Sequence, residues 1–298
     1  MRKLVFVELS ILCILTVCAL ALPQTSDPVL VGAGDIADCN SSHSGGGPLS
    51  TAQLTANLLD GISGTVFAVG DLVYPDATGG EFTKCYDPTW GRHRARTMPA
   101  PGNHEYNTPN ASDYFNYFGP IAGDPTKGYY SFNLGAWHII ALNSNTECST
   151  ISCASGSPQV NWLQADLNAN PTTCTLAFWH HPYYSSTTNA TSSVQPFWQV
   201  LYNAKADLVI NGHAHSYERF APQDANGNLD TTNGIIEIVS GTGGESHGGF
   251  TTILPNSVIR DNTSYGVLKL TLHSSSFDWQ FVHAAGATFT DSGTATCH

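Results

Sequence analysis

Short apolar runs recur along the chain, and most of them end in a polar side chain. Four runs are apolar almost throughout: 28–34, 65–69, 176–179 and 208–210. Such runs are typical of strands that are buried on both faces of a sheet covered by helices. Between them, segments with an apolar face at helical spacing predict helices at 48–59, 157–167 and 194–203. The front of the chain is therefore expected to alternate between strands and helices.

The last third of the chain has a different pattern, in which apolar and polar residues alternate. We expect antiparallel strands at 235–239, 267–272 and 277–282. The segments 129–132 and 137–142 predict a pair of strands, whereas 70–104 is expected to be mostly loop. These patterns predict an α/β fold (an α+β sandwich), with two mixed sheets packed face to face and helices outside.

The first 22 residues have the pattern of an export leader. Arg2 and Lys3 precede the apolar run 4–22, and Ala19-Leu20-Ala21 fits a cleavage site of small residues. We predict a signal peptide at 1–21 and one domain at 22–298, because no linker or charge block divides the rest. An uncleaved anchor and a lipoprotein processed at Cys18 are the alternatives. The predicted location is secreted, extracellular or periplasmic.

The charge of the chain limits its partners. The 298 residues include 11 basic and 23 acidic side chains, which gives a formal net charge of -12. Nucleic acid is excluded as the main partner, because no basic stripe exists to neutralise a phosphate backbone. A small phosphorylated substrate would have to find positive charge locally, and bound cations supply it. After leader cleavage, no remaining segment is long and apolar enough to hold the chain in a membrane.

Side chains that bind metals stand at the ends of five apolar runs. The segments VGAGD, FAVGDLVY, PGNHE, LAFWHH and LVINGHAH supply Asp35, Asp71, Tyr74, Asn103, His104, His180, His181, His213 and His215. Open α/β sheets hold their ligands at the carboxyl ends of strands. Each aspartate alone would more often be a cap, and Asn103 alone could hold a turn. Five such ends together predict one site.

These donors suit a centre of two metal ions. Carboxylates can bridge two cations, and imidazole suits zinc, iron and manganese. We expect Asp35 and His215 to bind the first metal and Asp71 to bridge both. The remaining ligands of the second metal would be Asn103, His180 and His213. The expected reaction is hydrolysis of a phosphate ester by metal-bound hydroxide, with both ions clamping an in-line displacement.

The order of these motifs resembles a known family. GD, GDxxY, GNHE, a strand that ends in His, and GHxH follow one another as in the calcineurin-like metallophosphoesterases, and GHAHSYER resembles their purple acid phosphatase branch. The resemblance implies the four-layer architecture of that family. Many relatives carry a histidine ligand where this chain has Ala37, and purple acid phosphatases use the tyrosine of GDxxY instead. It therefore implies Tyr74 as a ligand, although a packed ring is the alternative.

Further roles follow from the same resemblance. A phenolate prefers a hard trivalent cation, which implies Fe(III) at the first metal, with Zn, Fe or Mn at the second. His104 is the expected catalytic residue, which orients phosphate or protonates the leaving group. The family pattern aligns His180 with the ligand, because Pro182 follows two residues later, and leaves His181 in the outer shell. Later histidines of the plant and animal enzymes are missing, so His181 and His247 are the candidate substitutes near the substrate.

The predicted function is that of a secreted, binuclear, metal-dependent phosphatase that hydrolyses phosphomonoesters, with residues 22–298 as its catalytic domain. A phosphodiesterase or nucleotidase with the same metal site is the alternative, and a metal-loaded binder of phospho-ligands without turnover is a third. Neither the natural substrate nor the oligomeric state follows from the resemblance.

Cysteine usage agrees with export. Six cysteines remain after the predicted leader: Cys39, Cys85, Cys148, Cys153, Cys174 and Cys297. An even number in an exported chain favours disulfides, although many pairings are possible. We predict a local bridge between Cys148 and Cys153. Cys39 and Cys85 both follow strands that carry predicted ligands, so we pair them, and Cys174 is left for Cys297.

Overall fold

The computed structural model describes residues 27–39 and 50–298. The predicted signal peptide at 1–21 lies outside these residues, so that prediction stays open. Within the described ranges, no helix has the length and apolar character that a bilayer crossing requires.

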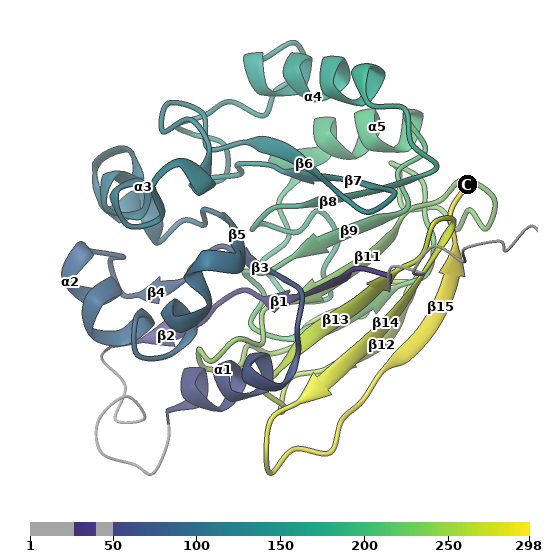
Figure 1. Cartoon of the computed structure of the whole chain (residues 1–298). Coiled ribbons are helices and arrows are strands. Elements are labelled where there is room, and N and C mark those ends of the chain that lie inside the picture. The colour runs from purple at the N-terminus through teal and green to yellow at the C-terminus, as the bar shows by residue number, and fades with distance from the viewer. Residues whose placement is uncertain (1–26, 40–49) are drawn as a thin grey trace, which may run out of the picture.

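Two large sheets form the centre of the molecule (Figure 1). The first contains β1 (Val29–Ala33), β3 (Thr65–Val69), β5 (Thr97–Ala100), β13 (Gly266–Leu272), β14 (Ser276–His283) and β15 (Ser292–Thr296). The second contains β6 (Tyr130–Leu134), β7 (Trp137–Ala141), β8 (Cys174–Phe178), β9 (Leu208–Asn211), β10 (Tyr217–Phe220), β11 (Ile236–Ser240) and β12 (Ser257–Asp261). A small pair consists of β2 (Ala37–Asp38) and β4 (Val73–Tyr74).

Both large sheets are mixed, as predicted. The order of the first is β15-β14-β13-β1-β3-β5, with β1, β3 and β5 parallel and the rest antiparallel. The order of the second is β12-β10-β11-β9-β8-β7-β6, with β7, β8, β9 and β11 parallel. Parallel strands therefore lie in both sheets, and their carboxyl ends carry the predicted ligands.

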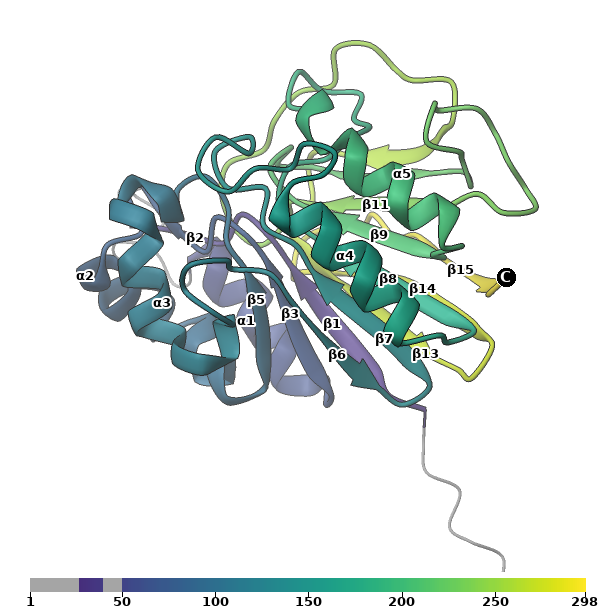
Figure 2. The ribbon, with the colours of Figure 1, turned by 90° about the horizontal axis from the view of Figure 1, so that it is seen from above.

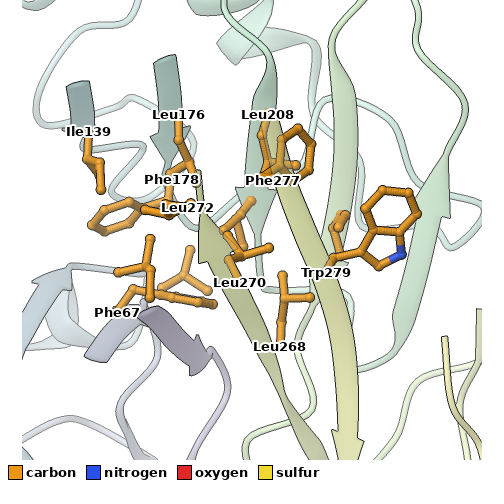
Figure 3. Close-up of a cluster of buried hydrophobic side chains, with 14 of the residues drawn as sticks. Phe67, Ile139, Leu176, Phe178, Leu208, Leu268, Leu270, Leu272, Phe277 and Trp279 are labelled. Atoms are coloured by element: carbon orange, nitrogen blue, oxygen red, sulfur yellow. The ribbon is translucent and has the colours of Figure 1, made fainter. Parts of the chain in front are cut away.

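The main apolar core lies between the two sheets. Phe67 and Leu268 from the first sheet pack with Ile139, Leu176 and Leu208 from the second, and all five are fully buried (Figure 3). Removing this apolar surface from water stabilises the stack by about 25 cal/mol for each Å² buried. The face-to-face packing of two sheets confirms the predicted fold class.

Helices cover the outer faces. They are α1 (Thr51–Gly61), α2 (Gly79–Glu81), α3 (Ser112–Phe118), α4 (Pro158–Ala169) and α5 (Gln195–Asn203). Figure 2 shows α4 and α5 together on the seven-stranded sheet, where Leu163 and Phe197 pack with Val209. On the other side, Leu59 of α1 packs with Val31 of the six-stranded sheet. The order helix, sheet, sheet, helix gives the four layers.

The starts of two helices follow from their sequences. The Ser157 hydroxyl accepts the N–H of Val160, and Pro158 occupies the first turn of α4. Ser50 caps α1 in the same way by accepting the N–H of Gln53. The predicted start at 157 is thus correct. The predicted start at 48 lies outside the described residues, and the described helix begins at Thr51.

The segment 70–104 is not mostly loop, and that prediction is wrong. It contains β4, α2, a π-helical turn at Phe82–Tyr86, a 3-10 helix at Trp90–Arg96 and the edge strand β5. A capping box between Thr78 and Glu81 starts the helical part. Strand β5 has only four residues and contains Pro99, which hides the usual strand pattern.

The strand predicted at 235–239 exists, but its expected antiparallel pairing is only half correct. Strand β11 pairs with β9 in parallel and with β10 antiparallel. All five of its residues are buried, including Glu237. Because Glu237 is polar, the sequence of this segment appears to alternate between apolar and polar residues, as in an antiparallel strand with one exposed face. The strand is in fact buried on both faces. Strands β10, β12 and β15 were not predicted.

The remaining short turns are 3-10 helices at Glu105–Asn107, Pro109–Ala111, Gly119–Ala122 and Ser192–Val194. The three predicted disulfides are confirmed: Cys39–Cys85, Cys148–Cys153 and Cys174–Cys297.

Candidate metal centre

The carboxyl ends of parallel strands from both sheets meet at one place. From the six-stranded sheet come Asp35 after β1, Asp71 after β3 and Asn103 after β5; from the seven-stranded sheet come His180 after β8 and His213 and His215 after β9. Asp71 Oδ2 lies 3.0 Å from His180 Nε2, and Asp35 Oδ1 lies 3.2 Å from His215 Nε2. One ligand atom each from Asp71, His180 and His213 lies within 4.8 Å of the others.

The Tyr74 hydroxyl lies among these atoms. It is 2.9 Å from Asp35 Oδ1, 3.2 Å from Asp71 Oδ2 and 3.2 Å from His215 Nε2. Tyr74 is 6% exposed, so this contact is sheltered from water. Burial, followed by the Asp35 and Asp71 carboxylates, raises the pKa of the Tyr74 phenol well above its usual value. A cation bound among these oxygens would lower the pKa of the Tyr74 phenol.

Two of the histidines are oriented by backbone carbonyls. His180 Nδ1 is 2.9 Å from the Val69 carbonyl, and His215 Nδ1 is 2.8 Å from the Ser246 carbonyl. A carbonyl only accepts, so each Nδ1 carries the proton and each Nε2 faces the carboxylates. This is the arrangement by which proteins fix metal-binding histidines.

The buried charges strongly shift one another's pKa values. Burial opposes the charged form of His180, but the Asp71 carboxylate outweighs it and raises the pKa of His180 to about 9. Burial and Asp35 act likewise on His215, whose pKa also rises to about 9. Burial and the neighbouring His180 lower the pKa of His213 to about 4. Shifts of this size in one cluster mark a candidate functional site.

Several of these residues have a left-handed backbone. The φ angles are 59° at Asp35, 50° at Asp71, 65° at His213 and 44° at His215. L-residues with a side chain rarely adopt this region, which leads the chain sharply away from the strand. The strand ends are thus bent so that each side chain turns into the shared space.

Glycines next to the ligands make room for them. A Cβ at Gly70 would clash with the His180 ring, and one at Gly102 would clash with the Asp71 carboxylate. The GD and GN pairs in the sequence therefore have a steric cause, because a ligand from another loop packs directly on each glycine.

His104 lies beside the cluster and reaches toward it. The backbone N–H of His104 donates to Asp71 Oδ1 at 2.9 Å. In its ring, Nδ1 faces the Pro75 carbonyl and Nε2 lies 3.9 Å from Asp71 Oδ2. The ring packs on Tyr74 and keeps 29% of its side chain exposed. A ring nitrogen of His104 is thus available at the open side of the cluster.

His181 is buried behind the ligands. Its ring lies 4.3 Å from the His213 ring, and the Ser144 hydroxyl contacts both its Nδ1 at 2.9 Å and its backbone N–H at 3.1 Å. Burial and the neighbouring His180 hold the pKa of His181 well below its usual value. Ser144 was not singled out by the sequence, because it lies 37 residues away and follows a different strand.

His247 has a different setting. Its ring packs on Tyr265, and its Nε2 is buried without a hydrogen-bond partner in the described part of the chain. The next residue, Gly248, donates its N–H to the His215 carbonyl. His247 thus flanks a predicted ligand, and its role toward a substrate stays a prediction.

Sequence reasoning also passed over Glu105. This carboxylate is fully buried and accepts the backbone N–H groups of Asp71, Leu72 and Gly102. Burial and the nearby Asp71 carboxylate raise the pKa of Glu105 to about 7. The only signal in the sequence was an acidic residue directly after Asn103-His104.

A second cluster lies at the opposite edge of the sheet. Cys174, Cys297 and Asp207 place possible ligand atoms close together. The two sulfurs are joined in a disulfide, so they are not thiolate ligands. This cluster is structural.

The sequence matches two family models. Residues 34–217 match the calcineurin-like phosphoesterase model, and residues 234–292 match the model described as iron/zinc purple acid phosphatase-like protein C. The chain belongs to the calcineurin-like phosphoesterase family. Within this family it is similar to the purple acid phosphatases, and the family implies a dinuclear centre of iron or zinc.

Two curated relatives of this phosphoesterase come from plants. Purple acid phosphatase 15 of Arabidopsis thaliana is 28% identical over 233 residues, which cover 65% of this chain and 42% of that protein. The nucleotide pyrophosphatase/phosphodiesterase of Hordeum vulgare is 27% identical over 279 residues, which cover 77% of this chain and 71% of that protein. The chain thus spans less than half the length of the first of these relatives.

Solved structures show the same fold. A purple acid phosphatase from yellow lupin (Lupinus luteus) seeds has a TM-score of 0.72 at 20% identity, over 92% of this chain and 54% of its own. GAP50, the anchor in the inner membrane complex of Plasmodium, has a TM-score of 0.67 at 14% identity, over 92% of this chain and 90% of its own. At these identities the likeness concerns the fold alone.

The residues present fit a pair of cations. Asn103 Oδ1 is buried and has no hydrogen-bond partner in the described part of the chain. A buried amide oxygen without a donor is costly unless something else binds it. The neighbouring loops bring carboxylate, phenol and imidazole atoms together, and with this amide the donor set suits iron, zinc or manganese.

Proposed function

We propose that this phosphoesterase hydrolyses phosphate esters at a centre of two cations. The observation that carries the proposal is the convergence on one space of six donors: Asp35, Asp71, Tyr74, His180, His213 and His215. One cation would be held by Asp35, Tyr74 and His215, the other by Asn103, His180 and His213, with Asp71 shared. The similarity to purple acid phosphatases supports Fe(III) at the first position and Zn, Fe or Mn at the second.

When bound, two such cations lower the pKa of a water nucleophile and neutralise charge on the phosphate. The protein's part is to hold the reacting groups in place. The shared position of Asp71 keeps the two binding positions adjacent, because its Oδ2 faces both the Tyr74 hydroxyl and His180.

His104 would act on the leaving group. Its Nδ1 faces the Pro75 carbonyl and therefore carries a proton. A second proton on Nε2 makes an imidazolium that can donate to the leaving oxygen, which contributes roughly 10²–10⁴-fold in rate. His181 would support the ligands from behind, since its buried ring packs on His213.

The proposed substrates are small phosphomonoesters. The formal net charge of -12 favours a small ligand held by cations over a polyanion held by basic side chains. Diesters are the second candidate, because the relative that covers the largest share of this chain among those named above is a nucleotide pyrophosphatase/phosphodiesterase.

We also propose that residues 22–298 form one exported catalytic domain. Residues from Leu30 to Trp279 share the core between the two sheets, which supports a single unit. Three disulfides support an oxidising compartment.

The proposal is tested with purified protein, an aryl phosphate and a bis-aryl phosphate. We expect about two transition-metal ions per chain, loss of activity on chelation, recovery on adding iron and zinc, and faster turnover of the monoester. Fewer than about one metal ion per active chain would overturn the two-cation centre. Faster turnover of the diester would replace the monoester assignment.

His104→Asn tests the role of that residue. We expect the turnover number to fall by roughly 10²–10⁴-fold, with unchanged metal content. His93→Asn is the control, because His93 is also a partly buried histidine, but it lies in the 3-10 helix Trp90–Arg96 and contacts Asp60 and Ala56. Unchanged turnover in His104→Asn would make this residue structural, and metal loss would make it a ligand.

A further inference from the structure

Glu105 joins the two loops that carry Asp71 and Asn103. Its Oε2 accepts the N–H of Asp71 at 2.9 Å and that of Gly102 at 2.6 Å, and its Oε1 accepts the N–H of Leu72 at 2.8 Å. Asp71 and Leu72 follow β3, whereas Gly102 follows β5. The Glu105 side chain is fully buried, so water does not compete for these bonds.

The contact between the loops is reciprocal. Asp71 Oδ1 accepts the N–H of His104 at 2.9 Å, while Glu105 accepts the N–H of Asp71. Each loop thus supplies a carboxylate that binds the backbone of the other loop. Asp71 has a left-handed backbone, and Glu105 satisfies the N–H groups of Asp71 and Leu72 that this bend turns away from the sheet.

We propose that Glu105 is a positioning residue that sets the spacing between Asp71 and Asn103 and thereby the affinity for the cation that they share. This inference rests on the proposed function, because it assumes that both residues bind a cation. Asn103 lies between Gly102 and Glu105, so the turn that Glu105 closes also presents Asn103 Oδ1, which has no hydrogen-bond partner among residues 27–39 and 50–298.

A carboxylate is needed at position 105 because it offers enough hydrogen-bond acceptor sites for the backbone N–H groups around it. Three N–H groups converge on two oxygens, which a carboxylate accommodates with its four lone-pair sites. Glutamine has one oxygen, and its amide would point N–H groups at an N–H donor. Glu105→Gln therefore leaves at least one buried donor unsatisfied and loosens one loop from the other.

The test compares Glu105→Gln with wild type and a matched control. Asp207→Asn is the control, because Asp207 is also a buried carboxylate that accepts two backbone N–H groups, from Thr175 and His298. It follows the turn before β9, at the edge of the sheet opposite the cluster. Each full-length protein is stripped with a chelator and titrated with Co²⁺ by calorimetry and visible spectroscopy, and the unfolding temperature of the metal-free form is recorded.

We expect wild type to bind two Co²⁺ ions and Glu105→Gln to lose roughly 10–100-fold in affinity at one of them, as is usual when a residue that orients a metal ligand is changed. Asp207→Asn should lower the unfolding temperature without changing either affinity. Equal Co²⁺ affinities in Glu105→Gln and wild type would overturn the inference. If wild type binds no Co²⁺, the proposed function itself fails.

Glu105→Asp is the second variant, in case Glu105→Gln does not fold. It keeps the carboxylate and shortens the side chain by one methylene. We expect its Co²⁺ affinity to lie between those of Glu105→Gln and wild type. The inference would be overturned if Glu105→Asp folds, no longer binds both loops, and still binds Co²⁺ as tightly as wild type.

Discussion

Tyr74 is the residue that most distinguishes this centre. Its hydroxyl contacts Asp35, Asp71 and His215, and its ring packs on His104. Ala37, two residues after Asp35, has no side chain that could bind a metal. The phenol therefore lies among the donors that we propose for the first cation.

We predict that the iron-loaded protein is coloured and that Tyr74→Phe removes the colour. A phenolate bound to Fe(III) transfers charge to the metal in the visible range, and phenylalanine has no oxygen to bind. Visible spectra and iron content of both proteins after reconstitution check this. The variant should lose affinity mainly for the first cation.

Tyr114→Phe is the matched control for this prediction. Tyr114 is also a fully buried tyrosine, but its hydroxyl donates to the Pro99 carbonyl. Its variant should keep the colour. Colourless, identical spectra of wild type and Tyr74→Phe would show that Tyr74 only packs against the loop.

Single residues could be predicted where their chemistry coincides with a strand end. The Asp35, Asp71 and His213 positions follow apolar runs directly, and the structure brings them together. Ser144 and Glu105 could not be assigned in this way, since their partners His181 and Asp71 are 37 and 34 residues distant. A side chain whose role is a contact across loops leaves no local pattern.

At the scale of elements, two disulfides bind the chain in different ways. Cys148–Cys153 closes a loop of sequence separation 5, beside Ser144. Cys174–Cys297 has a separation of 123 and ties the end of β15 to the start of β8. The longer closure removes more conformational freedom from the unfolded chain.

We therefore predict that Cys174→Ser/Cys297→Ser is the more destabilising pair. The chain-entropy model gives a loss of about 5 kcal/mol for it and about 2 kcal/mol for Cys148→Ser/Cys153→Ser. Urea unfolding of both double variants and wild type measures the difference. Equal losses would mean that strain or residual structure, and not loop length, sets the stabilisation.

The elements with the clearest periodicity were also predicted best. Strand β3 and helix α4 match their predicted segments closely, because β3 is apolar after Thr65 and α4 has a serine cap. The turns between Phe82 and Arg96 follow from side chains packed around Phe82 and Trp90, which local sequence does not encode. Glu237 misled the reading of β11, since a buried carboxyl looks like an exposed one in the sequence.

At the scale of the whole molecule, the candidate centre joins the two sheets. Asp35, Asp71 and Asn103 come from one sheet, while the three histidines proposed as ligands come from the other. A cation that binds ligands from both sheets binds only the folded state, in which the two sheets are packed together, and therefore stabilises that state.

We predict that metal removal lowers the unfolding temperature. Ligand at 100 times its dissociation constant stabilises a fold by about 2.7 kcal/mol, which corresponds to roughly 5–10 °C for a chain of this size. Calorimetry with and without chelator measures the shift. His213→Ala should show a much smaller shift, and an equal shift in that variant would locate the stabilising ions elsewhere.

The left-handed backbone of four residues at three strand ends has a consequence for the evolution of such chains. A non-glycine residue in this region costs on the order of 1–2 kcal/mol, and glycine or asparagine would relieve it at 35, 71 and 213. The cation binding that we propose for aspartate and histidine at these positions would offset this cost. In a descendant freed from selection for this binding, substitutions at these positions would stabilise the scaffold while abolishing catalysis. A homologue with glycine at several of these strand ends, in an otherwise intact sequence, would therefore be expected to have lost catalysis and kept a structural role.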